Sequence, residues 1–280
     1  MMDLSIIIVN YNTKDLLNAA IRSVISNPPS GEFEIIVVDN ASTDGSKEYL
    51  QCLNFKQVTA IFSNENLGFS KANNLGLKKA LGRYILFLNP DTRVLPHTLE
   101  KCLQYMKQHP ETGVLGCRVL LENGELDLAC RRSFPTLSNT FFRFTHLSKL
   151  FPNSRIFAQY NLTFLPEDQI YPVDCLVGAF MMVPKAILKE CGSFDEDYFM
   201  YGEDIDLCYR IRMAGYQNIY FGTSSIIHCK RASSKKSVRA KETFYESMLI
   251  YYQKHHQDKH GKLVSYLVKA GVWIVKKLNL

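Results

Sequence analysis

The sequence predicts an α/β fold built on a mostly parallel central sheet that is flanked by helices. Two observations predict it. Short apolar runs rich in Val and Ile alternate with helix-like segments through the first 120 residues, an order typical of βαβ units. These runs are apolar along most of their length, as strands covered on both faces are. The 280 residues suffice for one large domain or two small ones.

Four strands and four helices are expected in the first half of the chain. The strand candidates are residues 5–9, 34–38, 59–62 and 84–88, and the helix candidates are residues 13–26, 43–53, 70–80 and 96–109. Asn12 or Thr13 is expected to cap the first helix, and Ser42 or Thr43 the second. Two prolines after Asn27 end the first helix.

The second half is less regular. Residues 131–172 mix aromatic, basic and proline residues with weak helical stretches, and residues 194–201 read as an acidic, aromatic loop. A strand is expected at residues 176–183, and helices at residues 203–214, 241–256 and 262–278. We therefore expect a domain over residues 1–235, divided into halves 1–117 and 118–235, followed by a helical tail over residues 236–280.

Composition and cysteine spacing exclude several classes of protein. With 46% hydrophobic and 21% charged residues, the chain is neither fibrous nor largely disordered. The apolar runs are shorter than the roughly 20 residues that cross a bilayer. The N-terminus reads as a first strand, not a signal peptide. No two of the eight cysteines are closer than 13 residues, so a CxxC pair is absent and a reduced, cytosolic protein is expected.

Positive charge is concentrated in the tail. Residues 230–280 carry 12 Lys and Arg against 3 Asp and Glu, a net of +9, whereas the rest of the chain has a net of −3. A basic tail on a near-neutral body suggests an anionic partner such as phospholipid, nucleic acid or a diphosphate. A solvated basic tail is an equally open interpretation.

Polar side chains follow each of the first four predicted strands, where ligands bind in an open parallel sheet. They lie at residues 10–12, 39–42, 64–68 and 89–91. Residues 9–22 contain no glycine, so the GxGxxG dinucleotide motif is absent, and so is a P-loop. The sequence therefore disfavours nicotinamide chemistry and P-loop phosphoryl transfer. If a nucleotide binds, its phosphates must be neutralised another way, and a divalent cation is the obvious means.

A set of motifs in order carries a family resemblance. The motifs are SIIIVNYN, VVDNAS, NENLGFSKANNLG, GRYILFLNPD, GAFMMV, YGEDIDLCYR and IIH, spread over residues 4–230. Together they resemble family-two glycosyltransferases of the GT-A fold, most closely the bacterial rhamnosyltransferase branch. The resemblance implies that residues 1–117 bind the donor nucleotide, and that residues 118–235 bind the acceptor and carry the catalytic base.

The resemblance implies a donor site at the strand ends. Val9 and Tyr11 would contact the nucleobase, with Tyr11 covering a pyrimidine face, and Asp39 would accept the N3–H of uracil or thymine. Asn66 and Asn74 would meet ribose or phosphate. A helix-capping role for Asp39 and structural turn roles for the two asparagines are the alternatives.

The resemblance also implies a metal site. Asn89-Pro90-Asp91 stands where the family has a DxD motif, so Asn89 replaces the first carboxylate and Asp91 is the anionic ligand. His228 would be the second protein ligand of a Mn²⁺ or Mg²⁺ ion, which diphosphate oxygens and waters complete. Lys230 and Arg231 would stabilise the diphosphate as it leaves.

The catalytic base implied by the resemblance is Asp204, at the start of a predicted helix. Glu203 would contact the acceptor, and Gly178 and Ala179 would let a sugar approach the backbone. Acidic residues in a first helical turn also suit the helix dipole, which is the structural alternative. Asp206 and Arg210 are four residues apart and are expected to form an ion pair. Residues 131–172 are a candidate acceptor contact or a packed subdomain.

The last predicted helix is amphipathic. Lys262, Lys269 and Lys276 recur every seven residues, and apolar residues occupy much of the rest of the segment. Such a helix can lie on an anionic membrane surface. The alternative is that its apolar face packs on the enzyme or on a second copy in a homodimer. A peripheral protein on the inner face of the cytoplasmic membrane is expected.

The implied activity is inverting, metal-dependent transfer of L-rhamnose from dTDP-L-rhamnose to a hydroxyl of a lipid-linked glycan, in bacterial surface-polysaccharide biosynthesis. A UDP-sugar donor carrying hexose, galactofuranose or N-acetylhexosamine is the first alternative. A glycan- or nucleotide-binding protein without turnover is the second, because Asn89 departs from the family pattern. A nucleic-acid partner is not expected, since only the charge of the tail would favour it.

Overall fold

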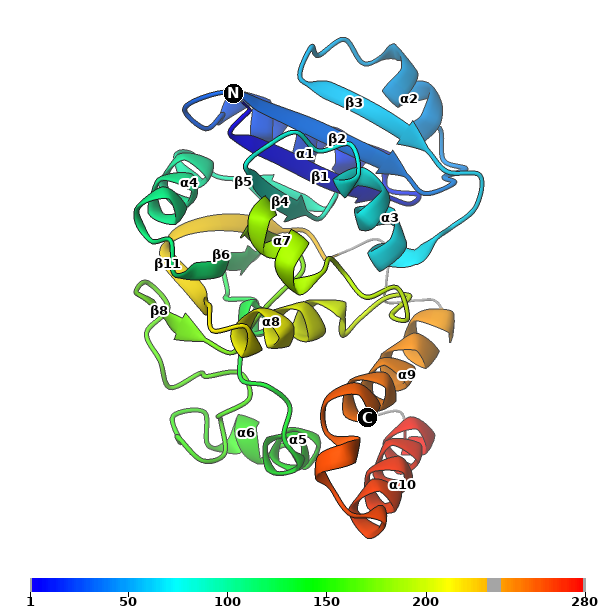
Figure 1. Ribbon diagram of the computed structural model, residues 1–280, viewed down its shortest axis with the longest axis vertical. Coiled ribbons are helices and arrows are strands. Elements are labelled where there is room, and N and C mark those ends of the chain that lie inside the picture. The colour runs from blue at the N-terminus through cyan, green and yellow to red at the C-terminus, as the bar shows by residue number, and fades with distance from the viewer. Residues whose placement is uncertain (1, 231–237, 279–280) are drawn as a thin grey trace.

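The computed structural model describes residues 2–230 and 238–278 (Figure 1). Its strands are β1 (Leu4–Asn10), β2 (Phe33–Asp39), β3 (Val58–Phe62), β4 (Tyr84–Leu88), β5 (Thr92–Val94), β6 (Thr112–Leu121), β7 (Arg131–Arg132), β8 (Ile170–Val173), β9 (Cys175–Leu176), β10 (Phe180–Pro184) and β11 (Gln217–His228). Its helices are α1 (Lys14–Ser26), α2 (Ser46–Cys52), α3 (Gly68–Leu77), α4 (Thr98–Gln108), α5 (Leu137–Phe144), α6 (Leu147–Leu150), α7 (Lys185–Cys191), α8 (Glu203–Met213), α9 (Val238–His255) and α10 (Lys262–Leu278).

One mixed sheet forms the centre of the molecule. Its strand order is β3-β2-β1-β4-β10-β6-β11-β5, with β8 paired to β11. The pairs among β1 to β4 are parallel, and so is β6 with β11, whereas β10 runs antiparallel to both of its neighbours. A second, two-stranded sheet pairs β7 with β9. The prediction of an α/β fold with a mostly parallel central sheet is confirmed.

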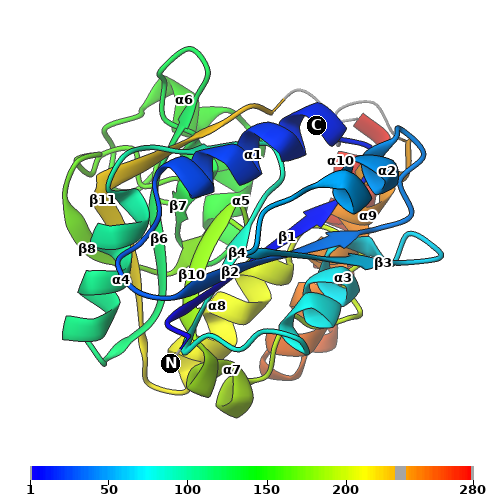
Figure 2. The same cartoon turned by 90° about the horizontal axis from the view of Figure 1, so that it is seen from above.

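Helices cover both faces of the sheet, which explains why the central strands β1 and β4 are apolar along most of their length. Figure 2 shows α1 on one side of β1 and β2, and α3 and α8 on the other. Every residue of β4 is buried, and so is nearly all of β1. On α1 the buried residues recur three or four positions apart, on the face that meets the sheet: Leu17, Ala20, Ile21 and Val24.

Most predicted elements of the first half are present, with ends shifted by a few residues. The predicted cap of α2 at Ser42 or Thr43 is wrong, because α2 begins after Gly45, which has a left-handed φ of 84°. The strand predicted over residues 176–183 is two strands, β9 and β10. The backbone of residues 177–179 leaves the ladder there and lines a cavity. The 194–201 loop is free of helix and strand, as predicted.

The last two helices lie away from the sheet. Figure 1 shows α9 and α10 side by side, next to α5 and on the opposite side of α8 from the sheet. The eight cysteines are all free thiols. In the part of the chain that the structure describes, no helix combines the length and the apolar character needed to cross a membrane. The proposed division at residue 235 remains a prediction.

Candidate active site

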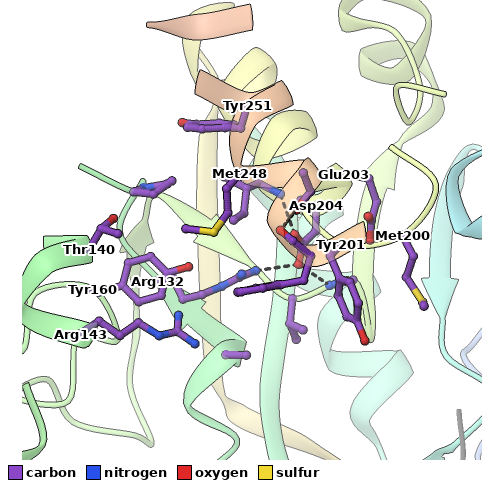
Figure 3. Close-up of a pocket in the computed structure, with 18 of the residues that line it drawn as sticks. Arg132, Thr140, Arg143, Tyr160, Met200, Tyr201, Glu203, Asp204, Met248 and Tyr251 are labelled. Atoms are coloured by element: carbon purple, nitrogen blue, oxygen red, sulfur yellow. Dashed lines mark hydrogen bonds and ion pairs between the residues drawn. The ribbon is translucent and has the colours of Figure 1, made fainter. Parts of the chain in front are cut away.

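A single cavity of about 1960 Å³ opens at the carboxyl ends of β1 and β4 and runs along α8 toward the C-terminal helices (Figure 3). It unites most of the residues that the sequence singled out. Those lining it are Val9, Tyr11, Asn66, Asn89, Asp91, Gly178, Ala179, Glu203, Asp204, His228 and Lys230. Asp39 and Asn74 do not line it. Arg231 lies outside the described residues.

The loops after β1, β2 and β3 are tied together by side-chain amides and one carboxylate. Asn10 Nδ2 donates to Asp39 Oδ1 over 2.9 Å, and the Ser42 backbone donates to Asp39 Oδ2 over 3.2 Å. Asn40 donates to Asn66 Oδ1 over 2.9 Å and accepts from the backbone of Leu67. Asp39 is thus buried among protein donors, and its contact with a nucleobase remains a prediction.

Asn74 has a different set of partners from the one expected. Its Nδ2 donates to the Phe194 carbonyl over 2.8 Å and to Glu196 Oε1 over 3.0 Å. Nearby, the Phe69 backbone donates to the Phe199 carbonyl. These bonds hold the 194–201 loop against α3, so the position of Asn74 favours a structural role over a contact with the donor.

Gly68 makes that close approach possible. Its φ is 79°, and a Cβ there would lie 2.4 Å from the Phe199 carbonyl oxygen. Glycine alone tolerates both the left-handed backbone and the absence of space. The start of α3 is therefore fixed between the donor-side loops and the loop that leads into α8.

His228 stands at the end of β11 between two carboxylates. Its Nε2 lies 3.1 Å from Asp91 Oδ1, and its Nδ1 lies 3.4 Å from Asp127 Oδ2. Lys230 Nζ donates to the other oxygen of Asp127 over 2.7 Å. Burial by itself would lower the pKa of His228, but the hydrogen bonds to Asp127 and Asp91 outweigh it and raise this pKa to about 9.

Asp127 is a member of this cluster that the sequence analysis missed. It is 3% exposed and accepts from His228 and Lys230. Burial would raise the pKa of Asp127, but these two partners hold it well below its usual range. A carboxylate that accepts from Nδ1–H leaves Nε2 as the nitrogen that a metal can bind once the metal displaces its proton.

Asp91 and His228 fit a divalent cation as a two-residue site. Ligand distances of about 2.1 Å at right angles place neighbouring ligand atoms about 3 Å apart, close to the 3.1 Å between Asp91 Oδ1 and His228 Nε2. Across residues 2–230 and 238–278, no cluster of three or more His, Cys, Asp or Glu side chains is arranged to hold a metal. The remaining ligands would have to be phosphate oxygens and waters.

Asp204, in the first turn of α8, is held by two donors from other parts of the chain. Arg132 Nη2 donates to Asp204 Oδ2 over 2.6 Å, and the Gly178 backbone donates to the same oxygen over 3.1 Å. Asp204 Oδ1 accepts from the backbone of Ile205. Figure 3 shows the Arg132 guanidinium reaching Asp204 at the cavity wall. Arg132 was not anticipated from the sequence, because its short strand β7 carries no motif.

Glu203 differs from its neighbour in having no partner for one oxygen. Within the described chain, Glu203 Oε2 is buried without a hydrogen bond. Burial, followed by repulsion from Asp204, raises the pKa of Glu203 to about 8. A carboxyl group that stays protonated near neutral pH can donate a hydrogen bond to a bound ligand.

Two further predictions concern Gly178 and the pair formed by Asp206 and Arg210. A Cβ at Gly178 would lie 3.5 Å from Phe69 and 3.8 Å from Asp204, which is ordinary contact, so the protein itself does not require glycine there. The predicted pair of Asp206 and Arg210 is confirmed at 2.8 Å. His255 also contacts Asp206, at 2.7 Å, and connects α8 to α9.

The sequence profile of glycosyl transferase family 2 matches residues 5–167. This match covers more than half of the chain, and it includes the strand ends that line the cavity. The chain belongs to glycosyl transferase family 2.

Three relatives align with about four fifths of this chain. The low-salt glycan biosynthesis hexosyltransferase Agl10 of Haloferax volcanii is 31% identical over 80% of this chain and 66% of its own length. The rhamnosyltransferase WbbL of Escherichia coli is 29% identical, with 80% and 82% covered. The N-acetylglucosaminyl-diphospho-decaprenol L-rhamnosyltransferase of Mycobacterium tuberculosis is 26% identical, with 82% and 77% covered. The predicted rhamnosyltransferase-like branch is confirmed, and the chain spans about two thirds of Agl10.

Solved structures support the fold. Residues 1–349 of TarS of S. aureus, in complex with UDP-GlcNAc, superpose with a TM-score of 0.64 at 18% identity, over 97% of this chain and 72% of that fragment. GalNAc-T7 with UDP, GalNAc and Mn²⁺ superposes with a TM-score of 0.65 at 15% identity, over 91% of this chain and 49% of GalNAc-T7. At such identities the likeness concerns the fold, and the predicted GT-A architecture is confirmed.

Proposed function

We propose that the protein is an inverting, metal-dependent glycosyltransferase of polysaccharide biosynthesis that transfers L-rhamnose from dTDP-L-rhamnose to a hydroxyl of a lipid-linked glycan. One observation carries the proposal: Asp204, the candidate base, and the Asp91–His228 pair line the same cavity. The names of WbbL and of the decaprenol-linked rhamnosyltransferase support rhamnose as the sugar. A UDP-sugar is the competing donor, supported by the TarS complex.

The donor would bind at the strand ends. Tyr11 would cover the base, and Asn66 and Asn89 lie on the cavity wall beside it. Asp91 and His228 would hold Mn²⁺ or Mg²⁺, which stabilises negative charge on the departing diphosphate when bound. Asp127 keeps the His228 ring oriented through Nδ1, and Lys230 places a positive charge at the same end of the cavity.

Asp204 would accept the proton of the acceptor hydroxyl. As that oxygen bonds to the anomeric carbon, the bond from this carbon to the diphosphate oxygen breaks, and its electron pair leaves with the nucleoside diphosphate. One such displacement inverts the anomeric centre. Arg132 and the Gly178 N–H bind Asp204 Oδ2, so the carboxylate has a fixed orientation. Glu203, protonated, would donate to an acceptor oxygen.

A thermal-shift panel tests the donor site. Wild-type protein is combined with dTDP, UDP or GDP, each with Mn²⁺, Mg²⁺ or EDTA. A ligand at a hundredfold excess over its Kd stabilises the native state by about 2.7 kcal/mol. We expect dTDP to stabilise the protein only with metal. Stabilisation by UDP alone would select the UDP-sugar, and no pyrimidine shift under any condition would overturn the donor assignment.

The Asp204→Asn variant separates binding from chemistry. We expect it to lose transfer to a soluble acceptor by at least about a thousandfold, because the amide cannot accept the proton, while the affinity for dTDP with Mn²⁺ changes less than about twofold. Retained transfer would place the base elsewhere. Tight dTDP binding with no transfer to any glycan, in wild-type protein, would favour a binding protein without turnover.

We further propose that α10 contacts the inner face of the cytoplasmic membrane. Tyr266 and Trp273 are exposed, and Lys269 lies between them. Aromatic side chains next to lysines suit an anionic lipid interface. Cosedimentation with phosphatidylglycerol vesicles should fall several-fold when Tyr266 and Trp273 are replaced by Ser, and unchanged partition would refute this contact. Light scattering in solution tests the homodimer alternative.

A further inference from the structure

The cavity continues beyond the candidate active site into a region lined by α5 and by the two C-terminal helices, α9 and α10. We call this region the apolar arm. Leu137 and Phe141 of α5 line it on one side, Met248 of α9 lies near its junction with the active site, and Val268, Leu267 and Ile274 of α10 line it on the other. Figure 1 shows α5 beside α9 and α10, although more than 90 residues separate them in the sequence.

Helix α10 has two apolar faces with different surroundings. Val264, Val268, Gly271 and Val275 line the cavity, and their spacing of three or four residues puts them on one face of the helix. Leu263, Tyr266 and Trp273 do not line it and are 61–73% exposed. The cavity therefore has its own apolar wall, separate from the outward face assigned above to the membrane.

Cationic side chains lie on the α5 and α6 side of the same cavity. The Arg143 guanidinium lies 4.7 Å from the centre of the Tyr160 ring, and both residues line the cavity. Lys149 of α6 lines it as well. In the described chain, neither cation has a carboxylate within ion-pair distance. Figure 3 shows Arg143 beside Tyr160, on the α5 side of the Arg132–Asp204 pair.

We propose that the apolar arm binds the hydrocarbon chain of a polyprenyl diphosphate-linked acceptor, and that Arg143 and Lys149 bind its diphosphate. The inference rests on the proposed function and assigns a place to the lipid. With the acceptor sugar at Asp204, the diphosphate of the acceptor would lie beside Arg143 and Lys149, and its hydrocarbon chain would lie in the apolar arm. Each methylene of such a chain that leaves water for the arm favours binding.

A hydrocarbon chain fits the arm better than the other occupants do. A peptide would bring backbone N–H and C=O groups that need hydrogen-bond partners, whereas every residue of α10 that lines the cavity is aliphatic or glycine. A second copy of the protein seated in the arm would block access to Asp204, because the arm and the active site are one cavity. A lipid-linked acceptor uses both parts at once.

Direct binding of soluble isoprenoids tests the inference without sugar transfer. Isothermal titration in EDTA measures Kd for farnesyl diphosphate, geranyl diphosphate and inorganic pyrophosphate, with palmitate as a plain alkyl anion. We expect farnesyl diphosphate to bind at least about tenfold tighter than geranyl diphosphate, and pyrophosphate to bind weakest. Equal Kd values for farnesyl diphosphate and pyrophosphate would overturn the arm as a lipid site. Palmitate binding as tightly as farnesyl diphosphate would overturn the assignment to a diphosphate lipid.

Two variants of the same helix give a matched control. Leu267 lines the cavity and Leu263, one turn earlier, does not, although both are exposed. We expect Leu267→Asn to weaken farnesyl diphosphate binding at least about fivefold and Leu263→Asn to leave it unchanged. Equal losses would indicate general damage to α10 and contradict the inference.

A third variant fills the arm without removing an apolar contact. A Cβ at Gly271 would meet no atom within 4 Å, so Gly271→Phe adds a ring to the space of the arm. We expect it to abolish farnesyl diphosphate binding, while Gly271→Ala retains it. Transfer to a short, soluble acceptor should persist in both. A wild-type protein that transfers sugar to a soluble acceptor but does not bind farnesyl diphosphate would refute the lipid site alone. A wild-type protein that transfers sugar to no acceptor would refute the proposed function.

Discussion

Replacing Glu203 by Gln should stabilise the protein increasingly as the pH rises. Glu203 is buried beside Asp204, with one oxygen lacking a partner in the described part of the structure. Its pKa is raised from 4.5 to about 8, first by burial and then by repulsion from Asp204. Because the folded state holds this proton more tightly than the unfolded chain, the stabilising effect is complete below pH 4.5 and is lost as the pH rises through 8.

The magnitude follows from the size of the pKa shift. One unit corresponds to about 1.4 kcal/mol, so the wild type should lose on the order of 3 kcal/mol from this group between pH 4.5 and pH 7, and on the order of 4 kcal/mol by pH 8.5. Glutamine has nearly the same shape and does not titrate. The two proteins should therefore have similar stability at pH 5 and differ most at pH 8.5.

Urea denaturation at pH 5, 7 and 8.5 measures the difference in unfolding free energy between the wild type and Glu203→Gln. Asp206→Asn is the matched control, since Asp206 is an equally buried carboxylate of α8 with Arg210 and His255 as partners. That variant should destabilise the protein at pH 7 and pH 8.5. A Glu203→Gln difference that is the same at all three pH values would refute the interpretation of Glu203 as a protonated carboxyl.

Three further changes test other contacts. Asp127→Ala should weaken Mn²⁺-dependent dTDP binding about tenfold or more in titration calorimetry, because His228 loses its orienting partner; unchanged affinity would show that Asp127 is dispensable. Arg132→Met should cost about 3–5 kcal/mol in urea denaturation by leaving Asp204 buried without its cation, and a loss below 1 kcal/mol would contradict this. Gly68→Ala should lower Tm by several degrees, since its Cβ would meet a backbone carbonyl at 2.4 Å.

The donor half of the fold is readable from the sequence because its signals are local. The strands β1, β2 and β4 each contain a buried apolar run that ends at a polar turn, whereas no residue of the edge strand β3 is buried. Helix α1, between β1 and β2, repeats its buried residues every three or four positions. The carboxyl ends of parallel strands meet at one edge of a sheet, so placing Tyr11, Asn66 and Asp91 near one another required only the strand assignments.

The second half resisted prediction because its elements are defined by distant partners. The apolar run at residues 176–183 looks like one strand, yet β9 pairs with β7, and β10 enters the main sheet antiparallel to β4. The residues of an apolar run do not by themselves indicate which strand each part of the run will pair with. Strand β7 has two residues, both arginines, and no periodicity marks it as a strand.

The sequence by itself determined the class of fold, the family and the acid, amide and imidazole groups of the candidate site, since these depend on residue type and order. Only the tertiary structure decided how they are paired. Arg132 meets Asp204 across 72 positions and Asp127 meets His228 across 101, while α10 encloses a cavity that begins at β1. Such contacts arise when the chain packs its helices and strands together, and no local pattern encodes them.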